Sequence, residues 1–97
     1  MVLGVVPRFN VWVSKNNRLN KIPKEYREPV KKDLANLAKV IRERRKQLGF
    51  TQEELAAILD VEPTTVQSIE QSRRSPSIEM FLSFCRALNL KLELTRL

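Results

Sequence analysis

The sequence has 97 residues, among them no histidine and one cysteine, Cys85. Metal sites are commonly built from cysteine and histidine, and a Ser-His-Asp triad needs a histidine base. The sequence therefore lacks the residues that such a metal site or triad requires. Glu53 and Glu54 are neighbours, but adjacent helix positions point apart and make no catalytic pair. We therefore expect a protein that is not an enzyme and binds no cofactor or metal. The lone cysteine excludes an internal disulfide, which fits a reducing cytosol, and we expect it in the core.

Glycine is also scarce, with only Gly4 and Gly49 present, so there is no glycine-rich phosphate loop. No apolar run approaches the ~20 residues that are needed to span a bilayer. The first residues, MVLGVVPRF, have too short an apolar run and no basic lead-in for a signal peptide. We expect a cytoplasmic protein without a membrane segment.

Acidic residues are outnumbered, with 11 Asp/Glu against 18 Lys/Arg and a net charge of +7. Residues 1–50 hold 13 Lys/Arg against 4 Asp/Glu, whereas residues 51–97 hold 5 against 7. A basic surface of this kind suits a polyanion, most simply nucleic acid, and solubility alone is the alternative. The hydrophobic fraction of 42% and the short length favour one small folded domain.

The most informative stretch is residues 51–70, TQEELAAILDVEPTTVQSIE. Thr51 and Glu54 form a capping-box pattern, in which each side chain binds the other residue's backbone amide at the start of a helix. Apolar residues then recur at helical spacing on one face: Leu55, Ala56 and Leu59. The sequence therefore predicts a short helix that begins after Thr51.

A second short helix is predicted directly after the break at residues 60–62. Pro63 suits its first position, because the missing N–H would be unpaired there anyway. Val66 and Ile69 give it an inward face, and the other faces carry short polar side chains: Thr64, Thr65, Gln67 and Ser68. Two helices that cross steeply over such a turn form a helix-turn-helix, whose second helix can lie in a DNA major groove.

A longer helix is predicted before this pair. Pro29 can open it, and it runs to about Leu48, where Gly49 ends it. Its core-facing residues follow 3-4 spacing: Leu34, Leu37, Ala38, Ile41 and Leu48. Its outer faces carry six cations: Lys31, Lys32, Lys39, Arg42, Arg44 and Lys46. These cations either face DNA or simply form the solvated surface of the helix.

Another helix is predicted after the pair, with Ser77 as its cap. Its inner stripe follows helical spacing: Ile78, Phe81, Leu82, Cys85 and Leu88. Met80 and Phe84 lie outside this stripe, so the apolar arc is wider than one small core requires. We expect these two residues to be buried against a second subunit.

The chain ends in a strand pattern at residues 89–97, where Leu90, Leu92 and Leu94 alternate with polar residues. A lone strand leaves its backbone groups unsatisfied and needs a mate. The mate is either the same strand of a second copy across a two-fold axis or the strand pattern at residues 9–14. We expect a homodimer.

Residues 1–28 are a basic extension, in which Lys15, Arg18, Lys21, Lys24 and Arg27 make a basic arm. Three roles are open for this extension. Its cations follow DNA phosphates, its short strand pairs with the edge of another strand, or the segment becomes ordered only when a partner binds. Trp12 is the candidate anchor for a partner, since tryptophan is enriched at interface centres. Its alternative role is to cap the domain's own core.

Residues 51–70, with residues 41–45 and 49–52 before them and residues 73–77 after them, resemble the helix-turn-helix of the Xre/Cro family of phage and bacterial repressors. A strand after the last helix resembles the HipB-like antitoxins of that family, where paired strands form a lid over the dimer. The resemblance implies a mainly α fold, a lambda-repressor-like helix-turn-helix domain of four to five helices. That domain would span 29–88, between the extension at 1–28 and a dimerisation strand at 89–97.

The resemblance also implies roles for single residues. Those facing base edges are Pro63, Thr64, Thr65, Gln67 and Ser68. Those placed for DNA phosphates are Thr51, Gln52, Arg73 and Arg74. Arg45 is expected to form a partly buried bridge with Glu70 that locks the reading helix. Asp60 stands where the family usually has glycine, and we expect it in the left-handed conformation, which aspartate tolerates better than most residues.

The leading hypothesis is a dimeric repressor of an operator in double-stranded DNA, and more narrowly the antitoxin of a toxin–antitoxin pair that regulates its own operon. The antitoxin part, with a toxin protein as partner, is implied by the resemblance alone. One alternative is a phage-type or chromosomal regulator without a toxin. Another is a protein-binding module on the same fold, because residues 60–70 contain three acids and no Lys or Arg.

Overall fold

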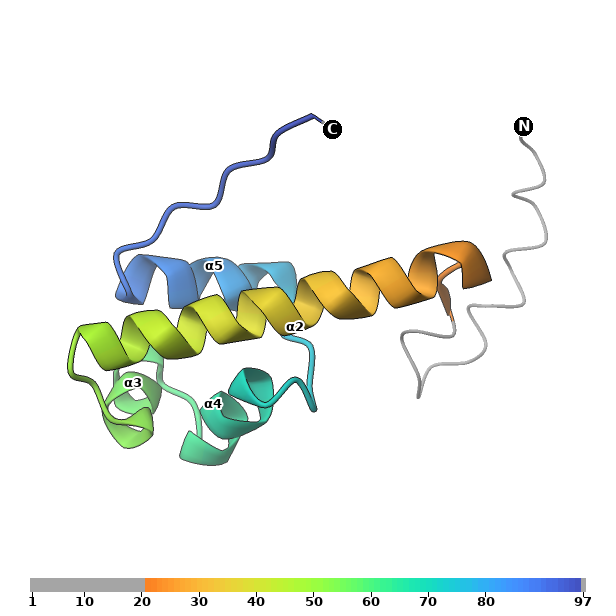
Figure 1. Cartoon of the computed structure of the whole chain (residues 1–97). Helices are drawn as coiled ribbons and strands as arrows, with labels where there is room; N and C mark the ends of the chain where they lie inside the picture. The colour runs from red at the N-terminus through yellow and green to blue at the C-terminus, as the bar shows by residue number, and fades with distance from the viewer. Residues whose placement is uncertain (1–20, 97) are drawn as a thin grey trace. The chain divides into compact units, whose positions relative to one another are not determined.

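The computed structural model describes residues 21–96, in which four helices follow one another (Figure 1). They are α2 (Lys24–Gln47), α3 (Gln52–Leu59), α4 (Pro63–Glu70) and α5 (Ile78–Ala87). The predicted strand at residues 9–14 and Trp12 lie outside the described residues. The chain divides into two compact units, residues 1–33 and 34–97. No helix among the described residues is long and apolar enough to cross a membrane.

The start of α2 differs from the prediction, because the helix begins at Lys24 and Pro29 lies inside it. Its first turn is held by the Tyr26 N–H, which donates to the Pro23 carbonyl at 2.9 Å, and by Arg27 Nε, which donates to the Ile22 carbonyl at 3.1 Å. A proline in the second turn forfeits one intrahelical hydrogen bond, and this first turn persists despite that loss. The prediction that Pro29 is the first residue of this helix was therefore wrong.

The end of α2 agrees with the prediction. The helix stops at Gln47, and Gly49 follows with a φ of +78°, a left-handed conformation that glycine adopts without strain. Of the predicted core-facing residues, Ala38 and Ile41 are buried, whereas Leu37 is 36% exposed. Within residues 21–96, the apolar face of α2 is therefore only partly covered.

The predicted helix–turn–helix is present at residues 51–70, and its local chemistry is confirmed. The Glu54 N–H donates to Thr51 Oγ1 at 3.0 Å, and the Thr51 N–H donates to Glu54 Oε1 at 2.8 Å, which completes the capping box. Asp60 ends α3 with φ 58° and ψ 48°, in the left-handed region. Pro63 takes the first position of α4. These local features set where α4 starts.

A small core joins α2 to the other three helices. Its buried members are Ile41, Leu55, Ala56, Val66, Ile69, Phe84 and Leu88. Every helix contributes to this cluster, and α4 contributes Val66 and Ile69, which are almost fully buried. α4 is therefore anchored by the inward face that the sequence predicted for it.

The predicted inner face of α5 is correct in part, because Cys85 and Leu88 are buried and Phe81 packs against the core, but two of its residues and one predicted outer residue differ. Ser77 caps the helix as expected, because its Oγ accepts a hydrogen bond from the Met80 N–H at 3.1 Å. Phe84, however, is fully buried within one chain, whereas the predicted inner residues Ile78 and Leu82 are 62% and 43% exposed. As folded, Phe84 therefore has no surface to offer a second subunit. The predicted inner stripe and the neighbouring pair Met80 and Phe84 are both apolar at helical spacing. Periodicity alone therefore could not show which of the two sets faces the core.

Cys85 is buried in α5, as predicted for a small core residue. Burial raises the pKa of its thiol, so the protonated form is favoured. This side chain belongs to the core.

The predicted C-terminal strand is not formed, because residues 89–96 carry neither helix nor strand (Figure 1). Leu90 packs against the core and its N–H donates to the Cys85 carbonyl at 2.7 Å. Beyond it, Leu92 is 37% exposed and Leu94 is 91% exposed. A strand needs the edge of another strand for its backbone groups, and the described part of a single chain supplies none.

Candidate nucleic-acid interface

The outer surface of α4 carries the residues that were predicted to read bases. Pro63 and Thr64 are exposed at the start of the helix. Thr65, Gln67 and Ser68 are half-buried. The opposite side of α4 is fastened to the core, so the structure holds a short polar surface in a fixed orientation on the domain.

A buried ion pair holds the end of α4 against α2. Arg45 Nε donates to Glu70 Oε2 at 2.8 Å, and Arg45 Nη2 donates to Glu70 Oε1 at 3.1 Å. The two side chains are 10% and 1% exposed. This is the bridge that the family resemblance implied, in a bidentate geometry that gives both strength and direction.

The same guanidinium satisfies a loop carbonyl. Arg45 Nη1 donates to the Phe50 carbonyl at 2.8 Å, immediately before α3. Its hydrogen bonds to the Glu70 carboxylate raise the pKa of Arg45, against the opposing effect of burial. Arg45 therefore ties α2 to the start of α3 and the end of α4 at once.

Gln52 also belongs to this network, which sequence reasoning missed. Its Nε2 donates to Glu70 Oε1 at 3.0 Å from the first residue of α3. The side-chain amide of Gln52 is therefore engaged within the protein, whereas the predicted phosphate contact of Gln52 involved the exposed amides at the start of this helix. No local pattern could have revealed this bond, because the two residues lie 18 positions apart in different helices.

The remaining residues predicted to contact phosphates lie at two places. Thr51 uses both its hydroxyl and its N–H in the capping box. Arg73 and Arg74 are exposed just after α4, and Arg74 Nη1 donates a long hydrogen bond of 3.5 Å to Thr65 Oγ1. The structure thus brings Arg74 beside α4 and leaves both guanidinium groups accessible to solvent.

Arg44 has a structural role that the sequence did not reveal. It was predicted to lie on the solvated face of its helix, but it is half-buried and its Nε donates to the Leu88 carbonyl at 2.9 Å. That carbonyl lies at the end of α5, where helix carbonyls lack intrahelical partners. Arg44 therefore links the last turn of α2 to α5.

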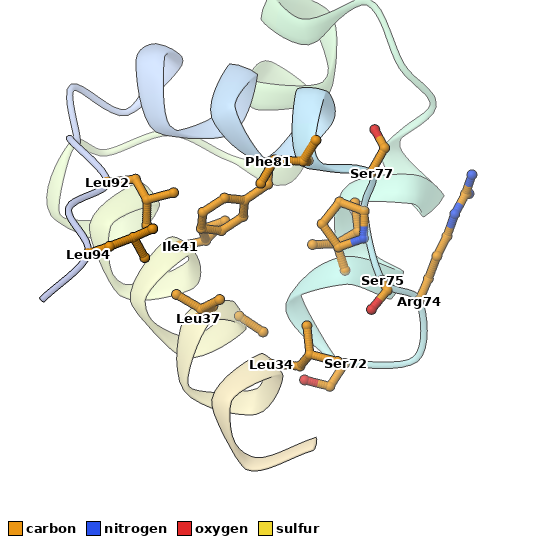
Figure 2. Close-up of a pocket in the computed structure, with 14 residues that line it drawn as sticks. Leu34, Leu37, Ile41, Ser72, Arg74, Ser75, Ser77, Phe81, Leu92 and Leu94 are labelled. Carbon is orange, nitrogen blue, oxygen red and sulfur yellow. The ribbon is translucent and has the colours of Figure 1, made fainter. Parts of the chain in front are cut away.

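An apolar groove of about 380 Å³ lies beside this surface (Figure 2). Leu34, Leu37 and Ile41 of α2 form one wall, and Leu92 and Leu94 of the C-terminal segment lie beside them. The rest of the lining comes from α2, the end of α4, the loop from α4 to α5 and the start of α5: Ala38, Ile69, Ser72, Arg74, Ser75, Pro76, Ser77, Ile78 and Phe81. The loop that follows α4 therefore also borders an apolar groove that residues 21–96 leave open.

Within residues 21–96, no group of three or more His, Cys, Asp or Glu side chains is arranged to hold a metal ion. The two arginines after α4, Arg73 and Arg74, are exposed, and so are Pro63 and Thr64 at its start.

Four helices, a capped α3, a left-handed turn and a partly exposed polar α4 define a helix-turn-helix domain. The helix-turn-helix family model matches residues 41–94, more than half of the sequence, and the chain belongs to that family. This match does not distinguish the HipB-like subgroup from the rest of the family.

One curated relative is an "Uncharacterized HTH-type transcriptional regulator" of Methanothermobacter thermautotrophicus. It is 47% identical to this chain over 49 residues, which are 50% of this chain and 71% of the relative. No solved structure gives a significant match.

Proposed function

We propose that the protein is a DNA-binding transcriptional regulator in which α4 lies in the major groove of its operator. The observation that carries the proposal is the two-sided character of α4. Val66 and Ile69 fix one side in the core, while Thr64, Gln67 and Ser68 keep exposed or half-exposed polar groups on the other side. Helices presented in this way read base edges in helix-turn-helix proteins.

Gln67 is the residue to which we assign the strongest base contact. Its amide has both a donor and an acceptor, which match N7 and N6 of adenine in a bidentate pair. Thr64 suits a thymine methyl or a phosphate, because its side chain carries both a methyl and a hydroxyl group. Arg73 and Arg74 follow α4 and supply positive charge for the backbone, which fixes register while the base contacts choose the sequence.

The salt dependence of binding follows from where the cations lie. Residues 60–70 contain no Lys or Arg, so α4 itself neutralises no phosphate. Arg73, Arg74 and the cations of α2 and the N-terminal extension must supply the electrostatic part of the affinity. We expect a modest salt slope if only Arg73 and Arg74 take part, and a steeper one if the basic extension also contacts DNA.

The Gln67→Ala variant tests the reading surface. We expect it to lose roughly 1–3 kcal/mol of binding free energy on the preferred operator and little on scrambled DNA, because a bidentate base pair is lost while the phosphate contacts remain. The measurement is a fluorescence-anisotropy titration with DNA from upstream of the gene. Gln71→Ala, which changes the exposed residue after α4, is the matched control and should leave both affinities unchanged. Equal losses on both DNAs would contradict a base-reading role for Gln67.

We further propose that the working form is a homodimer joined through residues 89–97. The support is chemical: Leu92 and Leu94 are exposed where they line the apolar groove, and within residues 21–96 the backbone around them has no partner strand. Pairing with a second copy would satisfy the backbone and cover the leucines. A dimer would also span two half-sites ~34 Å apart and so recover affinity that one short helix lacks. Met80 is half-buried, and its predicted part in the dimer remains a proposal.

The Leu94→Asp variant tests the dimer. We expect it to raise the concentration at which the dimer dissociates by tenfold or more, because a charge replaces an apolar contact; about 1.4 kcal/mol is enough for a tenfold change. Sedimentation equilibrium over a concentration series gives the measurement. Thr95→Asp adds the same charge on the other side of a strand and should have a smaller effect. A wild-type monomer at all concentrations would refute the dimer.

The narrower role, an antitoxin that represses its own operon, rests on the resemblance to HipB-like proteins. Its test is expression of the chain with its neighbouring genes and purification of any stable complex with a toxin. A regulator without a toxin is the alternative. The acidic segment at residues 60–70 separately favours a protein-binding module, and equal weak binding to all DNA sequences would support that function instead.

A further inference from the structure

Glu62 occupies an unusual position directly before α4. It is the N-cap residue of that helix, yet its side chain makes no capping hydrogen bond. It is exposed, and no hydrogen bond or ion pair engages its carboxylate within residues 21–96. Aspartate, asparagine, serine and threonine are the usual residues at this place, because their short side chains reach the amides of the first turn. Glu62 therefore holds the start of α4 through no side-chain hydrogen bond, and its carboxylate acts there only through its negative charge.

The neighbours of Glu62 make its charge unfavourable on DNA. Pro63 and Thr64 follow it at the end of α4 that enters the groove in our proposed function, so the carboxylate would come between two phosphate backbones. No Lys or Arg lies between residues 60 and 70 to offset the repulsion. A carboxylate at such a place is favourable only where a base offers it a hydrogen-bond donor.

The major groove offers two exocyclic amino groups, and their surroundings differ. The amino group of adenine lies between two acceptors, N7 of its own base and O4 of the paired thymine. The amino group of cytosine has an acceptor, guanine O6, on one side only. A carboxylate accepts hydrogen bonds and donates none, so it meets less repulsion at cytosine.

We propose that Glu62 is a specificity-determining residue that accepts a hydrogen bond from N4 of a cytosine, and so selects a C·G pair at the operator position facing the start of α4. This inference rests on the proposed function, because it needs α4 in the major groove. Beyond that function, it specifies one base of the operator, a cytosine, and names Glu62 as the residue that recognises it.

A randomised-operator selection with the full chain tests the proposal, using the wild type, Glu62→Ala and Glu62→Gln. The wild type should select cytosine at one position of each half-site, by roughly 5- to 150-fold over other bases, the range expected for one good base contact. Glu62→Ala should lose the preference at that position alone and bind scrambled DNA more tightly, because a repulsive charge is gone. Glu62→Gln should move the preference toward adenine, since an amide both donates and accepts.

Glu79→Ala is the control for net charge, because Glu79 is an exposed acid in the first turn of α5. It should leave the base preference intact. If Glu62→Ala keeps the cytosine preference, or the wild type selects a sequence without cytosine near α4, the role of Glu62 is overturned while the regulator remains. If the wild type selects no sequence at all, the proposed function fails as well.

Discussion

Replacing Glu70 with alanine should lower the free energy of unfolding by about 3–5 kcal/mol, because the change strands a buried guanidinium. Arg45 is 8% exposed, and both of its bonds to Glu70 would be lost together with the Gln52 contact. Such a loss is a large part of the total stability of a small domain, which is typically about 5–15 kcal/mol. Urea denaturation followed by circular dichroism gives the measurement.

The double variant Arg45→Met, Glu70→Met separates the stranded charge from lost packing. It should recover much of the stability, because two apolar side chains of similar volume leave no uncompensated charge. Arg42→Met, on an exposed position of the same helix, should change the free energy of unfolding by less than about 0.5 kcal/mol. A loss below 1 kcal/mol in Glu70→Ala would mean that the pair does not hold α4 as the structure indicates.

Replacing Phe84 with alanine should lower the free energy of unfolding by about 3–5 kcal/mol, because a fully buried ring leaves a cavity. The loss of stability relative to the wild type should be the same at different protein concentrations, because Phe84 packs within one chain. The same denaturation experiment, run at two protein concentrations, measures both quantities.

Leu82→Ala is the matched control on the same helix, with a side chain that is 43% exposed. It should lower the free energy of unfolding by less than about 1.5 kcal/mol, because much less apolar area leaves the core. A Phe84→Ala variant that keeps its stability but loses its dimer would show the ring at an interface, as the apolar pattern first suggested, and would contradict the core described here.

Local chemistry explains what the sequence predicted well. The capping box at Thr51, the left-handed Asp60 and the cap at Ser77 each depend on atoms within a few residues. Pro63 sets the start of α4 for the same reason. Since α4 is bounded by these signals, the sequence could predict its position and its polar face without any knowledge of tertiary contacts.

Tertiary contacts explain what the sequence could not predict. α5 carries two apolar arcs, and only packing against α3 and the core chose the one with Phe84. Gln52 and Arg44 were assigned to the surface, but each binds a group far along the chain, Glu70 and the Leu88 carbonyl. The strand pattern after Leu88 needs a partner edge, which the described part of one chain does not contain.

The most direct test of DNA reading by α4 is the affinity of the wild-type protein for DNA from upstream of its gene, compared with a scrambled duplex of equal length and composition. The comparison is made by anisotropy at two salt concentrations. We predict that the protein binds the native sequence more tightly by a factor of 10³ or more at near-physiological salt. The ratio of the two affinities should persist as the salt concentration rises. Equal affinities that fall together with salt would mean that the protein binds only phosphate and would contradict a reading role for α4.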